Sequence, residues 1–287
     1  MLAVVAAGEG PSLEQVPPPE PAPGEALLEV ELVGICRTDA LAAYGRLPVP
    51  GAMPLGHEFS AKILKSASWP VGQRVAVNPW SWCGHCPRCS SGHPYACAGA
   101  QMLGLHRPGA LAPLVAVPER ALYPVELGPQ RAAYVEPVAA TLASAALLPA
   151  GADVLVPGQG RIAALTRRVL GALGYAPHSS GPSRYAVETD PDSLTALLEA
   201  VEPGGTVVIK SRVPRAEVPL LPIAQKQLQL KGAWCGSYEQ AIELVQSLEV
   251  EDLFGPTYRL DQAPALLALD RSEALKEFVD VRDCRLS

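Results

Sequence analysis

The spacing of hydrophobic and polar positions changes part-way along the chain. Up to about residue 125, short apolar runs alternate with glycine- and proline-rich stretches, a pattern that predicts strands and turns. The predicted strands are residues 2–7, 26–33, 58–64, 74–77 and 114–117. Short strands broken in this way are typical of a small barrel or a strongly curved sheet.

From about Arg131 onward, helical spacing appears between the apolar runs. Residues 131–148 predict an alanine-rich helix. Residues 154–156 then predict a strand, which leads through a glycine turn into a helix over 161–173. Further strands are predicted at 185–188, 206–209 and 228–234, and further helices at 192–201 and 238–248. Strands that alternate with helices indicate a parallel sheet, so the fold class is α/β.

Length, composition and charge narrow the class of protein. A chain of 287 residues has room for two domains, and its 48% hydrophobic and 18% charged residues exclude extended disorder. The net charge of −6 argues against a nucleic-acid or membrane partner. No apolar run approaches the ~20 residues of a membrane span. The start lacks the basic segment of a signal peptide, so we expect a cytoplasmic protein.

The counts of asparagine, proline and lysine bear on the growth temperature and genome composition of the host organism. The chain has one asparagine, Asn78, against 30 prolines, and only six of its 23 basic residues are lysine. Few thermolabile amides and many loop prolines are typical of a heat-adapted protein. A GC-rich genome would give the same bias, and both interpretations stay open.

Four of the seven cysteines lie close together, and they carry the most specific signal in the chain. Cys83, Cys86, Cys89 and Cys97 are separated by two, two and seven residues. Four thiolates at this spacing fit a closed, tetrahedral structural zinc site, and unligated buried thiols would rarely be so tightly grouped. His85 and His93 lie in the same loop, but four thiolates already complete such a site, so we expect both to be exposed spectators.

A second set of possible metal ligands is spread over two segments, which we expect to be nearby loops. Cys36 is followed by Thr38 and Asp39, and His57 is followed by Glu58. A thiolate, an imidazole and a carboxylate could hold a metal with one open position. Each piece alone is weak evidence, because a single cysteine near a single histidine is usually core packing.

These segments, the four-cysteine loop and the Gly158-Gln159-Gly160 turn follow the order found in zinc-containing medium-chain dehydrogenases/reductases, and the chain resembles that family over nearly its whole length. The resemblance implies a GroES-like β-barrel catalytic domain and a Rossmann domain. It also implies a catalytic zinc, a structural zinc and a nicotinamide cofactor. We expect the catalytic domain to cover residues 1–145 with 238–287, and the Rossmann domain to cover 146–237.

The resemblance also implies roles for individual residues. Cys36 and His57 match the family's catalytic zinc ligands, and Glu58 matches the carboxylate that ligates the metal or alternates with water. Glu136 matches a further ligand position, and glutamate there resembles the polyol, threonine and glucose dehydrogenase branch. Thr38 matches the hydroxyl that passes on the substrate's proton. Asp39 could instead orient His57 from behind.

The dinucleotide motif is present, but the segment after it is too short. Gly158, Gly160 and Arg161 open the helix in a Gly-x-Gly-x-x-Ala pattern that suits a diphosphate. The residues at 175–182, where an acidic ribose-binding residue is expected, contain no carboxylate. Residues 185–188 resemble the fourth Rossmann strand, and the preceding segment cannot hold two complete strand–helix units. The sheet therefore lacks part of its adenosine-binding half.

Three hypotheses follow from the shortened domain. The chain could be an active oxidoreductase that moves a hydride between a secondary alcohol or polyol and NAD or NADP, with His178 or Arg184 as possible contacts to a 2′-phosphate. It could be a zinc-binding non-redox or scaffold protein that has lost dinucleotide binding. A partner chain could complete the cofactor domain. The complete zinc ligand set favours the oxidoreductase, with a homodimer or homotetramer implied by the resemblance.

Overall fold

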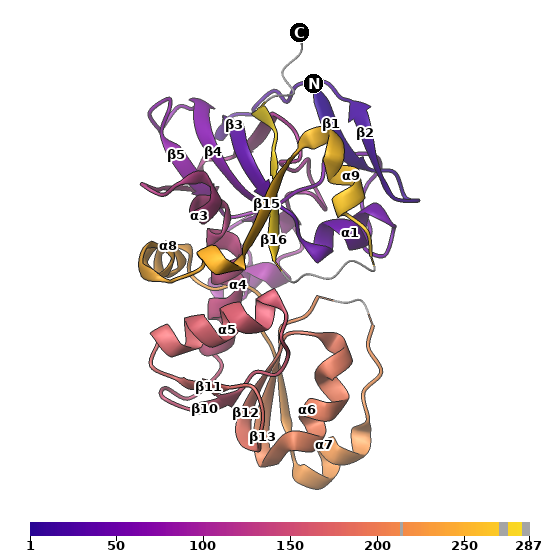
Figure 1. Cartoon of the computed structure of the whole chain (residues 1–287). Coiled ribbons are helices and arrows are strands. Elements are labelled where there is room, and N and C mark those ends of the chain that lie inside the picture. Colours follow the sequence, from indigo (N-terminus) through magenta and orange to yellow (C-terminus); the bar gives the residue numbers. More distant parts are fainter. Residues whose placement is uncertain (213–214, 270–274, 283–287) are drawn as a thin grey trace. The chain divides into compact units, whose positions relative to one another are not determined.

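The computed structural model describes residues 1–212, 215–269 and 275–282, which form two compact units (Figure 1). One unit holds Met1–Glu136 and most of the described residues after Leu253; the other holds Pro137–Leu253. Within the described residues, no helix combines the length and the hydropathy needed to cross a membrane. The predicted domain boundaries at 145/146 and 237/238 differ from these divisions, and they stay predictions.

The first unit is built on a seven-stranded sheet. Its strands follow the order β15-β16-β3-β4-β5-β9, and β8 also pairs with β3. All neighbours are antiparallel except β15 and β16. The strand bounds are β3 (Glu25–Gly34), β4 (Glu58–Lys65), β5 (Arg74–Val77), β8 (Leu114–Pro118), β9 (Leu122–Pro124), β15 (Phe254–Arg259) and β16 (Lys276–Asp280).

Shorter elements surround this sheet. They are β1 (Leu2–Ala6) paired with β2 (Pro11–Gln15), β6 (Trp80–Ser81) paired with β7 (Gln101–Met102), the helices α1 (Arg37–Ala43), α2 (Pro87–Ser90), α3 (Pro129–Ala133) and α9 (Ala263–Leu266), and the 3-10 turns η1 (Pro94–Ala96), η2 (Glu119–Ala121) and η5 (Leu260–Gln262). The main core of the unit lies against the sheet, where Leu28, Val30, Ala61, Ile63 and Val75 are all buried. Within β3 and β4 these residues alternate along the strand, so one face of each strand is turned toward the core.

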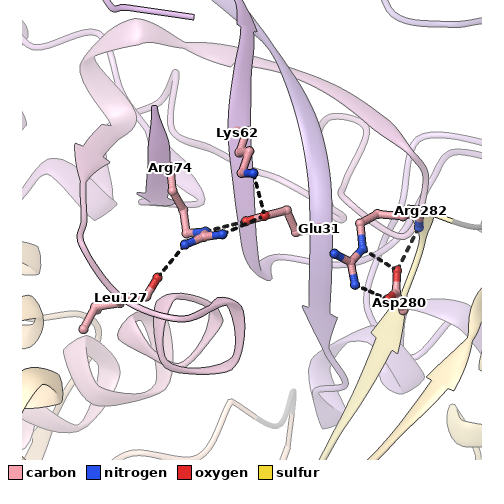
Figure 2. Close-up of polar contacts among 6 residues, drawn as sticks. All are labelled: Glu31, Lys62, Arg74, Leu127, Asp280 and Arg282. Atoms are coloured by element: carbon pink, nitrogen blue, oxygen red, sulfur yellow. Dashed lines mark hydrogen bonds and ion pairs between the residues drawn. The ribbon is translucent and has the colours of Figure 1, made fainter. Parts of the chain in front are cut away.

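A buried carboxylate ties three strands of this sheet together. Glu31 of β3 accepts two hydrogen bonds from the guanidinium of Arg74 on β5, at 2.7 and 3.0 Å, and Lys62 of β4 lies 3.7 Å away (Figure 2). Burial acts to raise the pKa of Glu31, but Arg74 outweighs it and holds the pKa below its usual value. Arg74 also donates to the carbonyl of Leu127, so the cluster fixes the chain that leads into α3.

The second unit contains a five-stranded parallel sheet in the order β11-β10-β12-β13-β14. Its elements are β10 (Asp153–Leu155), α5 (Arg161–Ala172), β11 (Ala176–His178), β12 (Ser183–Glu188), η3 (Pro191–Ser193), α6 (Leu194–Ala200), β13 (Val201–Ile209), α7 (Leu220–Lys226), β14 (Gln229–Gly232), α8 (Tyr238–Ser247) and η4 (Glu251–Leu253). Helix α4 (Val135–Ala145) begins at the division between the units.

Both faces of this parallel sheet are covered by helices. Val154 and Val187 pack with α5 in one apolar cluster, whereas Leu155 and Ala186 pack with α6 in another. Figure 1 accordingly shows α5 on one side of the strands and α6 on the other. Neighbouring residues of each strand point to opposite faces of the sheet, and both faces are buried. The strands therefore appear in the sequence as continuous apolar runs.

The strand order confirms that the cofactor half is shortened. A complete doubly wound sheet has the order 3-2-1-4-5-6. Here β10 takes the place of the first strand, and β12 lies directly beside it as the fourth, as the sequence predicted. The second strand is present as β11, a three-residue edge strand at the position where no acidic residue was found. No strand pairs with the outer side of β11 among the described residues, so the third is missing.

Two local predictions were wrong. The predicted helix over 131–148 is two helices, α3 and α4, with Tyr134 between them. The cause is Pro137, which lacks an N–H and would clash with the carbonyl of Ala133 in a continuous helix. The segment after Cys36 was interpreted as a loop, but Thr38 and Asp39 lie in the first turn of α1.

Candidate functional site

The register of two neighbouring strands brings Cys36 and His57 together. Gly34, the last residue of β3, pairs with Glu58, the first residue of β4. Cys36 follows this pair as the N-cap residue of α1, and His57 precedes it. One ligand atom each from Cys36, His57 and Glu58 lies within 4.8 Å of the other two, and the last two residues are buried. The structure thus joins three of the predicted catalytic-zinc ligands.

Asp39 fixes the orientation of the His57 ring. Its Oδ1 atom lies 3.0 Å from Nδ1 of His57 and accepts a hydrogen bond from the backbone N–H of Gly56 at 3.0 Å. With Nδ1 engaged, Nε2 remains for a metal. Burial alone would lower the pKa of His57, but Asp39 and Cys36 outweigh it and hold the pKa well above its usual value. Zinc binding, which requires neutral imidazole, would therefore release a proton.

Replacement of Asp39 by asparagine tests this orientation. The amide oxygen of the new side chain can still accept from both Gly56 and His57, but the negative charge behind the ring is lost. We expect Asp39→Asn to weaken zinc binding at this site or to lower activity by about 10–100-fold, as is usual for such partners. Competition with a fluorescent chelator measures the affinity. An unchanged zinc affinity and unchanged activity would contradict the assigned role.

Sequence reasoning missed Lys276, which contacts Glu58 at this site. The residue is 1% exposed; its Nζ atom forms an ion pair with Oε2 of Glu58 and donates to the carbonyl of Ile35 at 2.8 Å. A Cβ atom at Gly34 would lie 3.1 Å from Oε2 of Glu58 and 3.2 Å from Cδ of Lys276, so glycine leaves room for the pair. Its own segment gave no signal, because Lys276 lies between Leu275 and Glu277 like an ordinary surface lysine, 218 residues from its partner.

The two remaining predicted site residues of this unit are both buried. Thr38 lies in the first turn of α1, two residues after Cys36. Glu136 lies in the first turn of α4, and the structure does not bring it into the group of Cys36, His57 and Glu58. The roles of Thr38 and Glu136 stay predictions.

The four cysteines of the loop converge as the spacing predicted. The sulfur atoms of Cys83, Cys86, Cys89 and Cys97 all lie within 4.8 Å of one another. Three of these separations are 3.5, 3.5 and 3.9 Å. A tetrahedral zinc with Zn–S bonds of about 2.3 Å spaces its ligands by about 3.8 Å, so the cluster fits this metal. His85 and His93 are exposed and outside the cluster, as expected.

The electrostatics of the four thiols also favour a cation. Backbone N–H groups of His85 and Cys86 lower the pKa of Cys83 to about 6, which favours its thiolate. Desolvation and the neighbouring sulfurs raise the pKa of Cys89 to about 12. Thiols this close cannot all ionise unless a positive charge lies between them, and a divalent zinc would supply it.

In the second unit, the glycine turn joins β10 to α5 as a dinucleotide motif requires. Gly158 has a φ of +96°, which favours glycine, and Gly160 precedes the first residue of the 12-residue helix α5. Both glycines are exposed, whereas Arg161 is 2% exposed. The turn lies at the carboxyl end of β10, between β11 and β12, where ligands bind in open parallel sheets.

The comparisons with known proteins agree with this geometry. Residues 22–127 match the alcohol dehydrogenase GroES-like domain. The L-threonine 3-dehydrogenase of Xanthomonas campestris is 32% identical over 216 residues, which are 71% of this chain and 60% of that protein. These matches support the resemblance to the medium-chain dehydrogenase/reductase family. The resemblance predicted from the sequence motifs is thereby confirmed. The chain spans only about 60% of the length of these curated relatives.

Solved dehydrogenase structures share the fold of this chain. A protein described as a zinc-binding dehydrogenase from Sinorhizobium meliloti, bound to NADP, is 25% identical with a TM-score of 0.83, covering 97% of this chain and 98% of that one. Galactitol-1-phosphate dehydrogenase from Escherichia coli is 19% identical with a TM-score of 0.86, covering 98% and 100%. The predicted α/β fold, a GroES-like domain with a shortened Rossmann domain, is thus confirmed.

Proposed function

We propose that the chain is a zinc-dependent oxidoreductase that transfers a hydride between a secondary alcohol or polyol and NAD or NADP. The observation that carries the proposal is the three-residue ligand set of Cys36, His57 and Glu58. Three protein ligands leave a position open for substrate, unlike the four thiolates of the closed cluster. The same chain also supplies a parallel sheet with a Gly-x-Gly turn.

The proposed metal-site residues have separate tasks. Cys36 and His57 would hold a zinc ion, which would supply Lewis-acid polarisation of an alcohol oxygen. Because Asp39 engages Nδ1 of His57, Nε2 of the ring points away from the Asp39 carboxylate. Lys276 neutralises Glu58, so this carboxylate can lie beside the site at a lower electrostatic cost. Glu136 matches a further ligand position by resemblance; if it binds, Glu58 would alternate with water, so that one position stays open for substrate. The hydroxyl of Thr38 would pass on the proton that the alcohol releases.

The cofactor would lie at the carboxyl edge of the second unit's sheet. NAD or NADP would supply the hydride acceptor there. Gly158 and Gly160 allow a diphosphate to approach the backbone, and the first turn of α5 with Arg161 favours its negative charge. Arg184, beside Gly204, lies at the amino end of β12, away from this edge. His178 is engaged by the carbonyl of Ser180 and lies 3.2 Å from Asp153. Neither placement supports a contact to a 2′-phosphate.

Calorimetry with both dinucleotides, on protein of counted zinc content, tests this function. We expect two zinc ions per chain and binding of NAD or NADP in the range of roughly 1 µM–1 mM. Turnover of a panel of secondary alcohols and polyols should follow with the dinucleotide that binds. Absence of binding at millimolar concentrations with both zinc ions present would favour the alternative, a zinc protein with a non-redox or scaffold role.

The cellular setting and assembly are extensions of the same proposal. We expect a cytoplasmic homodimer or homotetramer with no nucleic-acid or membrane partner, as the family resemblance and the charge suggest. Light scattering on purified protein measures the assembly.

A further inference from the structure

The loop that would receive the dinucleotide is held from one side by a single arginine. One guanidinium nitrogen of Arg167, in the second turn of α5, donates to the carbonyl of Val156 at 2.7 Å and to that of Gly158 at 3.0 Å. Val156 follows β10, and Gly158 is the first glycine of the motif. Arg167 therefore links its own helix to both ends of the turn that precedes it.

This contact determines which way the loop's backbone N–H groups point. In a trans peptide the C=O and N–H lie on opposite sides, so a Gly158 carbonyl that faces Arg167 directs the N–H of Gln159 the other way. Over the ranges that the structure covers, the N–H groups of Gly158, Gln159 and Gly160 have no protein acceptor. They remain available to bind an anion.

The charge of Arg167 is not balanced by a protein carboxylate. Its only protein partners in the described part of the chain are the two carbonyls. The side chain is half-buried, and this burial lowers its pKa, so a nearby anion would relieve the cost of its charge. The neighbouring Arg168 differs, because Asp252 and the carbonyl of Glu249 engage it.

The shortened sheet explains why the loop needs such a contact. In a complete adenosine-binding half of a Rossmann sheet, a third strand and a second helix lie beyond the second strand. In this chain the second strand is the edge strand β11, which is only three residues long. Arg167 lies one helical turn before Gly171, whose position faces Pro177 of β11. The arginine thus lies on the flank of α5 that the missing elements would have bordered.

We propose that Arg167 is a positioning residue for the dinucleotide: it fixes the Gly158–Gln159 peptide so that the loop's N–H groups face the diphosphate, and its unopposed positive charge lies behind the loop, on the side opposite that anion, where it still attracts it. This inference rests on the proposed cofactor-dependent function. It assigns to this chain a contact that compensates for the missing part of its cofactor domain.

The test compares Arg167→Met with Arg168→Met, a matched change at the next position of the same helix. Calorimetry gives the Kd of NADH and NADPH, and steady-state kinetics give KM for the dinucleotide and kcat. We expect Arg167→Met to raise Kd and KM by about tenfold or more while kcat changes less than threefold. Arg168→Met should change Kd less than twofold. Arg167→Lys, which keeps the charge on a less rigid group, should give an intermediate Kd and serves if the methionine variant does not fold.

The outcomes separate the two proposals. Wild-type protein that binds neither dinucleotide overturns the cofactor-dependent function and this inference with it. Wild-type binding that Arg167→Met leaves unchanged overturns only the role of Arg167. An equal loss of affinity in Arg167→Met and Arg168→Met would show a general effect on α5 and would also overturn it. Melting temperatures of the two variants show whether their folds are comparable.

Discussion

Cys36→Ser is expected to abolish turnover and to lower the zinc content from two ions per chain to one. A serine hydroxyl stays protonated near neutral pH and is a poor zinc ligand, so only His57 and Glu58 of the three-residue group would remain. Loss of Lewis-acid polarisation removes several kcal/mol of transition-state stabilisation, which corresponds to a fall in kcat/KM of about 1,000-fold or more. Elemental analysis and kinetics on the same sample measure both effects.

Cys235→Ser is the matched control for this change. Cys235 is half-buried in the second unit and belongs to neither metal-binding group. It should keep both zinc ions and wild-type turnover, whereas Cys36→Ser should lose activity with little change in melting temperature. Full activity in Cys36→Ser would exclude the proposed zinc site from the reaction.

Cys89→Ser is expected to destabilise the first unit while leaving the chemistry intact below the melting temperature. A structural zinc contributes folding free energy directly, and loss of one of four thiolates should cost ~3 kcal/mol or more. For a protein of this size the melting temperature should then fall by about 10 °C. Calorimetric scans with zinc analysis measure this effect, and kcat at low temperature should stay within a few-fold of the wild-type value.

His93→Ala serves as the control within the same loop. Its ring is exposed, 3.4 Å from the hydroxyl of Ser91, and is not part of the four-sulfur group. We expect its zinc content and melting temperature to match the wild type. A Cys89→Ser protein that lost one zinc ion but melted at the wild-type temperature would contradict a structural role for this metal.

Much of the fold could be predicted because the apolar spacing is regular. The observed bounds lie close to the ranges predicted from short apolar runs and from helical spacing for strands β3, β4, β5 and β8 and helices α5 and α8. The position of β12 as the fourth strand followed from the length of the segment between α5 and β12, since two strand–helix units do not fit there. Strand β11 was missed because three residues with a central proline carry no strand pattern.

The candidate site was predictable only where its residues are neighbours in the sequence. The four-cysteine loop lies within one short segment, so spacing alone indicated its geometry. The pairing of Cys36 with His57 depends on the β3–β4 register, and it came from family resemblance. Lys276 could not be found, because nothing in its own segment shows that β16 pairs with β3 beside Glu58.

The proline in β11 has a consequence for solubility. An unpaired strand edge is a template on which other chains can add strands and aggregate. Ala176 and His178 direct their backbone groups toward β10, through hydrogen bonds to Ala152 and from Val156. The intervening Pro177 therefore faces outward, and it has no N–H to offer an incoming strand. The chain can thus carry a sheet that ends early without presenting an edge that recruits other copies into a growing assembly.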